Sequence, residues 1–304
     1  MKKKPAPRAP ATSFKGFAIV GALVCAAVGV ILLAKRPSPT PPAARIVSEE
    51  PVRVLGWRIA DYLLSQRDHY RRDIVTTVEP EWTSFTPAYF TSLKERKDAV
   101  IAWASGRSKP VPVDFIGLIH VKIAEQNTPE ELARIDAIQT ERFEVLKARA
   151  SGASVVAIEE TGSDAVMTPD EYLRITRDTF QNLFGLALPP DAELLAHMRQ
   201  DRQAATRAIM EGLPAPVICG EEWPIHFETR LLRRPPDPAR PAADAAIYDL
   251  TESLNELRSE IILIRALEFL KRTDGRAAII LQGSGHGRFL ERVATEYHVA
   301  LTVL

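Results

Sequence analysis

The chain is poor in cysteine, which rules out two kinds of stabilising site. Its 304 residues include only two cysteines, Cys25 and Cys219. Because Cys25 lies in a long apolar run, the rest of the chain holds one thiol and cannot form an internal disulfide. No Cys-x-x-Cys pair occurs, so a zinc site built on thiolate pairs is excluded. The cysteine content fits an oxidising or a reducing compartment equally well.

Acidic residues are absent from the first 45 positions, although the chain as a whole is electrically balanced. This segment carries eight Lys or Arg residues, whereas the chain has 39 basic and 39 acidic residues in total. Residues 46–304 therefore hold 31 bases against 39 acids, a formal charge of −8. Such an acidic domain repels a phosphate backbone, which excludes nucleic acid as a partner.

Several motifs that hold phosphates or nucleophiles are also missing. The glycines of the Gly-Ser-Gly-His-Gly run at 283–287 depart from the spacing of a dinucleotide fingerprint, and too little chain follows for a Rossmann half. No Walker lysine accompanies them. Ser284 does not lie in a Gly-x-Ser-x-Gly elbow, which argues against a conventional serine hydrolase.

A long run without charge is present near the N-terminus. After a basic tail at 1–15, residues 16–34 form 19 consecutive uncharged positions. As a helix they would span about 28 Å, close to the hydrocarbon thickness of a bilayer. Lys35 and Arg36 end the run without a small-residue cleavage site, so we expect an uncleaved single transmembrane helix. A long signal peptide is the alternative.

The charges around this run predict the orientation of the chain. Five bases precede the run and three follow it before position 46. The positive-inside rule then favours a cytoplasmic N-terminus and an exported domain, periplasmic or extracellular. Residues 35–51 are rich in proline and predict an extended linker between the membrane and the domain at 52–304.

The first half of the domain shows a strand, a long helix and a second strand. Val111–Ile119 is apolar and β-rich, and a capping box at Thr128 opens a helix that continues to about Ala150. A short apolar strand follows at 154–158. This βαβ pattern predicts that the two strands are parallel neighbours. A second capping box at Thr168 predicts a helix to about residue 186.

The second half is less regular and then regains a clear pattern. Residues 188–245 are rich in proline, and we interpret them as an insertion or lid with one helix near 192–210. Apolar residues from Ile247 to Ile264 recur at heptad spacing, which indicates a long helix packed on a core or, alternatively, a dimer coil. Strand 277–281, helix 288–296 and strand 299–304 form another βαβ pattern. The fold class is therefore α/β, mainly a parallel sheet with flanking helices and a helical insertion.

Polar residues follow three of these strands. They are His120, Glu159 with its neighbour Glu160, and His286 in the glycine loop of Gly283, Gly285 and Gly287. Ligands of open parallel sheets bind beyond the carboxyl ends of the strands. Two imidazoles and a carboxylate can bind a metal or act as an acid–base set. Strand alternation sends Glu159 and Glu160 to opposite faces, so one of them points into a shared site.

Two other polar groups lie in the proline-rich segment. Arg230, Arg233 and Arg234 could meet an anionic substrate, haem propionates or anionic headgroups, or be ordinary loop bases. His226 lies close to Glu221, Glu222 and Glu228, but the spacing matches no metal motif.

Three segments resemble, in order, a known superfamily. Gly117-Leu118-Ile119-His120, the strand that ends in Glu159, and Gly283-Ser284-Gly285-His286 look like the motifs of the TraB/TIKI, erythromycin-esterase-like and ChaN-type proteins. The resemblance covers residues 111–165 and 277–304, and it does not extend to 51–110 or 188–245.

The resemblance implies a function that the residues alone do not. It suggests a metal-dependent hydrolase of peptide or ester bonds, in which His120, Glu159 and His286 bind Mn, Zn or Co or a water, and the three glycines help to hold the ligand. Because the superfamily also includes haem-binding lipoproteins, a non-catalytic protein that binds haem or another anion is the alternative. A degenerate domain that serves as a tethered interaction module is a third. The substrate, a small molecule or a peptide, and the oligomeric state stay open.

Overall fold

The computed structural model describes residues 86–119, 128–162, 165–178, 189–232 and 241–304. The basic tail, the apolar run at 16–34, the linker and His120 lie outside these residues. Among the helices that the structure describes, none has the length and apolar character required to cross a membrane.

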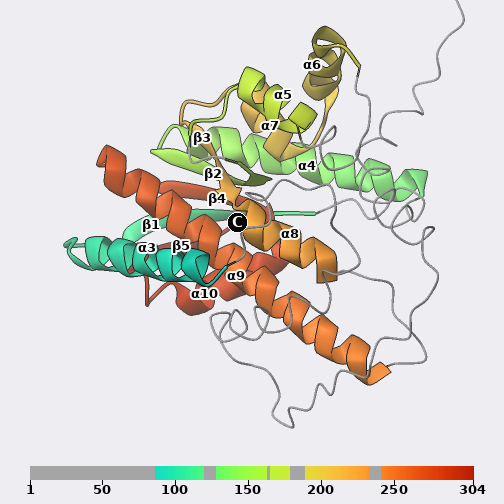
Figure 1. The fold of residues 1–304 in the computed structure, drawn as a ribbon. Coiled ribbons are helices and arrows are strands. Elements are labelled where there is room, and N and C mark those ends of the chain that lie inside the picture. The colour runs from blue at the N-terminus through green and yellow to red at the C-terminus, as the bar shows by residue number, and fades with distance from the viewer. Residues whose placement is uncertain (1–85, 120–127, 163–164, 179–188, 233–240) are drawn as a thin grey trace, which may run out of the picture.

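A five-stranded parallel sheet forms the centre of the described fold (Figure 1). The strand order is β3-β2-β4-β1-β5, and every neighbouring pair is parallel. This confirms the α/β class with a parallel sheet. The strands are β1 (Val111–Leu118), β2 (Val155–Thr161), β3 (Val217–Glu221), β4 (Ala278–Gly283) and β5 (Val299–Val303).

Helices cover both faces of the sheet (Figure 1). One face packs against α3 (Pro87–Ser105), α9 (Pro241–Thr273) and α10 (Gly287–Val293). The other packs against α4 (Pro129–Ala150) and α7 (Ala204–Met210), with α5 (Pro169–Asp178) and α6 (Asp191–Gln200) beyond them. Helix α8 (Trp223–Leu232) follows β3 and packs on α9. The described domain is therefore a three-layer α/β/α sandwich.

The lateral order of the strands differs from the prediction. We expected β1 and β2 to be neighbours, but β4 lies between them and pairs with both. Likewise, β1 lies between β4 and β5. The strands are parallel as expected, but apolar strands buried on both faces resemble one another, so their sequence carries little information about which lies beside which.

The proline-rich segment is more than an insertion with one helix. The expected helix near 192–210 is two helices, α6 and α7, with Asp201–Gln203 between them. Beyond them the segment supplies β3, an edge strand of the sheet, and then α8. The strand has only five residues and lies between Pro216 and Pro224, so its pattern is too short to stand out in the sequence.

The two capping residues and the long helix behave as the patterns predict. Thr128 accepts a hydrogen bond from the Glu131 backbone while the Glu131 carboxylate accepts one from the Thr128 backbone. Thr168 accepts from the Glu171 backbone. Leu254, Leu257, Ile261 and Ile264 of α9 are buried in the sheet-facing core, which favours the core-packed helix over a dimer coil.

Candidate active site

Glu159 lies near the carboxyl end of β2 and joins two other elements of the fold. Its Oε1 accepts a hydrogen bond from Arg258 Nη2 of α9 at 3.0 Å. Its Oε2 accepts one from the Gly283 backbone N–H, at the end of β4, at 2.6 Å. The side chain is only 9 % exposed. Two donors, one on a helix and one on the neighbouring strand, therefore fix the carboxylate in one position.

His286 lies between β4 and α10, as the N-cap residue of that helix, and its ring is held by Ser259. Ser259 Oγ of α9 donates to the Asn255 carbonyl at 2.9 Å and lies 2.6 Å from His286 Nδ1. We assign the hydroxyl proton to the Asn255 carbonyl, and in this assignment His286 Nδ1–H donates to Ser259 Oγ. The lone pair of the neutral ring is then on Nε2, which lies 3.9 Å from Glu159 Oε1.

A second carboxylate and imidazole lie at the end of the neighbouring strand. Glu221, the last residue of β3, contacts Arg258 Nη2 through Oε1, and its Oε2 lies 2.6 Å from His226 Nδ1 of α8. The same guanidinium nitrogen thus contacts Glu159 and Glu221. Burial alone would raise the pKa of Glu221, but Arg258 and His226 hold that pKa well below its usual range.

The Arg258 guanidinium is the positive centre of this network. Its side chain is 7 % exposed, and Nη1 also donates to Asn255 Oδ1 at 3.2 Å. Burial would lower the pKa of Arg258, but the charges of Glu221 and Glu159 outweigh it and raise that pKa. The guanidinium therefore stays charged and keeps two buried carboxylates compatible with folding.

Glu160 points away from this network, as strand alternation predicts. Burial is the main cause of the raised pKa values of Tyr172 and Cys219, and the negative charge of Glu160 is the second. Both side chains belong to the core between the sheet and the helices α4 and α7. Glu160 thus faces the opposite side of the sheet from Glu159.

The remaining candidates from the sequence are distributed as follows. Glu159 and His286 come together in the structure, whereas His120, Arg233 and Arg234 lie outside the described residues, and the Arg230 side chain is also not described. Strand β1 ends at Leu118, in register with Gly283 of β4. The described residues therefore supply two of the three expected groups. Within the same described residues, no cluster of three or more His, Cys, Asp or Glu side chains is placed to hold a metal ion.

Two glycines of the loop have a structural role in the described fold, while their role in holding a ligand stays a prediction. Among the described residues, the only glycine with a positive φ is Gly212, so the loop does not need glycine for its backbone angles. A Cβ on Gly287 would lie 2.8 Å from the Phe115 ring, whereas one on Gly285 would meet nothing within 4 Å. Gly287 therefore allows α10 to approach β1, and Gly283 serves the site through its backbone N–H.

The sequence contained a signal for the residues that were missed. Ile158-Glu159-Glu160 lies near the end of β2, and Gly220-Glu221-Glu222 spans the end of β3, so the same acidic pair follows two apolar runs. On α9, Arg258, Ser259 and Arg265 are buried polar residues in a helix that is mainly apolar toward the sheet. Polar residues inside a buried stripe need partners, and here those partners are Glu159, Glu221 and His286.

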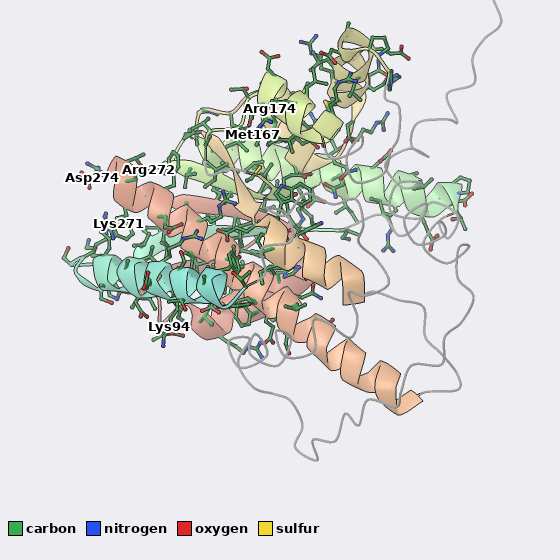
Figure 2. The ribbon with its side chains drawn as sticks, viewed as in Figure 1. Lys94, Met167, Arg174, Lys271, Arg272 and Asp274 are labelled. Carbon is green, nitrogen blue, oxygen red and sulfur yellow. The ribbon has the colours of Figure 1, made fainter. Side chains whose placement is uncertain are left out.

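Two further features adjoin the network. Gln282 of β4 is fully buried, and neither atom of its amide has a hydrogen-bond partner within the described part of the chain. By alternation from Ile280 it faces the α9 layer, as Glu159 does. An open groove of about 970 Å³ lies beside Glu222 and Trp223. Its other lining residues include Tyr89, Arg96, Arg265 and Phe269. Lys271 and Arg272, which also line the groove, lie near the end of α9 (Figure 2).

The chain matches no family model, no curated protein and no solved structure.

Proposed function

We propose that the chain is a membrane-anchored hydrolase of the TraB/erythromycin-esterase-like kind, which cleaves an ester or peptide bond beyond the ends of β2 and β4. The observation that supports this proposal is the pair formed by His286 and Glu159. The unprotonated nitrogen of a ring held by Ser259 lies 3.9 Å from a fixed carboxylate. An oriented imidazole beside a buried carboxylate is a common arrangement for general base catalysis.

In the proposed reaction, His286 Nε2 takes a proton from the attacking water. Glu159 stabilises the imidazolium that forms, because its carboxylate is held close by Arg258 and Gly283 and cannot turn away. The unpartnered amide of Gln282 offers a donor and an acceptor to the polar groups of a substrate. A substrate carbonyl that accepts a hydrogen bond from this amide would offset the free-energy cost of burying it without a partner.

A divalent ion such as Mn, Zn or Co fits the chemistry of this pair. Glu159 Oε1 and His286 Nε2 are an oxygen and a nitrogen donor of the types that these ions accept, and Ser259 orients the imidazole as an outer-shell partner does. His120 would be the third ligand in this proposal. A bound ion would supply a water of lowered pKa. Haem as the ligand stays an alternative, because Arg230, Arg233 and Arg234 could pair with its propionates.

The proposed location is an exported face of a membrane. Residues 16–34 would anchor the chain and the proline-rich linker would hold the acidic domain away from anionic headgroups.

The test uses the purified full-length chain in detergent. Esters and fluorogenic peptides are supplied with EDTA or with Mn, Zn or Co. Because general base catalysis contributes about 100-fold or more, Glu159→Gln and His286→Ala should each lower kcat/KM by at least about 100-fold. His197→Ala, on α6 in the opposite layer, is the matched control and should keep the wild-type rate.

Circular dichroism and urea midpoints would show that the variants fold. Hydrolysis that survives in both site variants would refute the proposal. A Soret band on addition of haem, lost in the same variants and without hydrolysis, would replace it with the receptor alternative.

A further inference from the structure

We propose that Glu221 and His226 form a second proton-transfer pair in the same site, in which His226 protonates the leaving group. The proposal rests on the proposed hydrolase function and extends it, because His286 and Glu159 account only for the activation of water. Hydrolysis of a poor leaving group also needs an acid on the other side of the scissile bond.

The contact between the two side chains has the geometry of a charge-assisted pair. His226 Nδ1 lies 2.6 Å from Glu221 Oε2. The Glu221 carboxylate is 1 % exposed, whereas the His226 side chain is 20 % exposed. The carboxylate is therefore a buried support, and the imidazole is the member of the pair that a substrate can reach.

The buried carboxylate stabilises a proton on His226. Two buried guanidinium groups surround Glu221: Arg258 contacts its carboxylate, and Arg265 donates to its backbone carbonyl at 2.6 Å. The carboxylate Oε2 is left for His226, and a charge-assisted hydrogen bond from an imidazolium Nδ1–H fits the 2.6 Å contact. In the protonated ring Nε2–H is the second donor, directed away from Glu221.

The sheet separates the two imidazoles into different positions. His226 follows β3 and His286 follows β4, and β2 with Glu159 lies between these strands. Arg258 contacts the carboxylates of both pairs. The proposed site thus has a base at one end and an acid at the other, and the Arg258 guanidinium joins the two pairs.

The groove begins beside this pair. Trp223, which lines the groove, meets the His226 ring edge to face, with ring centroids 6.0 Å apart. In the proposal the departing part of the substrate lies on this side of the site, next to His226.

The step balances in atoms and protons. The water oxygen bonds to the carbonyl carbon, and its proton passes to His286 Nε2. The bond from carbon to the ester oxygen or peptide nitrogen breaks, and the leaving atom takes the proton of His226 Nε2. Neutral His226 keeps its Nδ1–H on Glu221, and solvent returns the proton from His286 to His226.

The test compares two esters with the same acyl group, one with a p-nitrophenyl and one with an ethyl leaving group. p-Nitrophenolate is stable as an anion and leaves without a proton, whereas the ethyl group must receive a proton to leave as ethanol. In the full-length chain, His226→Gln should lower kcat/KM for the ethyl ester by about 100-fold or more and for the p-nitrophenyl ester by less than about threefold. Glu221→Gln should show the same selectivity, and His197→Gln should change neither rate.

The aryl ester also reports folding, because a variant that keeps this rate has an intact site. Equal losses on the two esters, or no loss on either, would overturn the role of His226 while leaving the hydrolase proposal in place. A wild-type chain that cleaves neither ester, with any of the metals, would instead reject both proposals.

Discussion

At the scale of single residues, Arg258 has the largest electrostatic effect in the described site. It neutralises carboxylates from two different strands, and all three side chains are less than 10 % exposed. A buried charge that loses its partner is much more costly than an exposed one, because water no longer solvates it. The arginine therefore makes the acidic ends of β2 and β3 possible.

The first prediction is that Arg258→Met lowers the free energy of unfolding by about 3 to 5 kcal/mol at pH 8. Arg292, which pairs with Glu256 on the surface, is the matched control. Because that pair is exposed, Arg292→Met should cost less than about 1 kcal/mol. Urea unfolding followed by circular dichroism measures both.

The loss of unfolding free energy in Arg258→Met should become smaller at acidic pH. In the wild type the pKa of Glu221 is held below its ordinary value of 4.5, so its stabilisation is present above pH 4.5 and is lost as the pH falls through the lowered pKa. Without Arg258, burial favours the neutral form of Glu221, so in the variant a falling pH protonates this carboxyl and removes the cost of its buried charge. A deficit that stays constant between pH 8 and pH 5 would contradict this account.

The second prediction concerns Cys219, which is 1 % exposed on β3. Burial, and then the charge of Glu160, raises the pKa of its thiol to about 12. Since the thiolate is the reactive form, the folded protein should not react with iodoacetamide at pH 8. A Cys25→Ser background isolates this thiol, and mass spectrometry after labelling measures it. Full labelling in 6 M urea is the control, and rapid labelling without urea would show that β3 is accessible.

At the scale of elements, the contact between α9 and β3 positions the site. A Cβ on Gly220 would lie 2.1 Å from Ile262 Cγ1 and 2.8 Å from the Ile158 carbonyl oxygen. Only glycine therefore allows the helix to lie this close to the strand. The next residue is Glu221, whose contact with Arg258 depends on the same approach.

The third prediction follows from this contact. Gly220→Ala should force α9 away from β3 and destabilise the fold by about 3 kcal/mol, the upper range for overpacking. Gly285→Ala is the matched control and should be nearly neutral, because no atom lies within 4 Å of the added methyl and its φ is not positive. Thermal unfolding of both variants tests the difference. Equal melting temperatures would show that the helix tolerates the methyl group.

Sequence patterns predicted most of these elements but not their neighbours. Caps such as Thr128 and the apolar period of α9 act within a few residues, so they can be recognised in the chain itself. The position of β4 between β1 and β2 depends on contacts between residues more than 100 positions apart. No local pattern encodes that order.

At the scale of the whole molecule, opposite charges occupy different parts of the chain. The basic segment at 1–45 flanks the apolar run, and the remainder is acidic. The fourth prediction is that the full chain sediments with membranes and resists extraction by alkaline carbonate, but is released by detergent. A membrane helix behaves in this way, whereas a peripheral protein does not.

A chain that lacks residues 16–34 is the control and should stay in the supernatant. Protease added to intact cells or spheroplasts should cut the wild-type domain if it is exported. Release of the full chain by carbonate would exclude the anchor, and a protected domain would reverse the proposed orientation.

The sequence by itself determined the α/β class, the caps, the core-facing side of α9 and the candidates Glu159 and His286, because apolar period, capping chemistry and strand ends are local properties. Only the tertiary structure decided the strand order and the partnership of Arg258 with Glu159 and Glu221. It also brought His226 to the same edge of the sheet. These features arise when distant segments pack and their buried charges must be compensated, and that requirement exists only once the chain has folded.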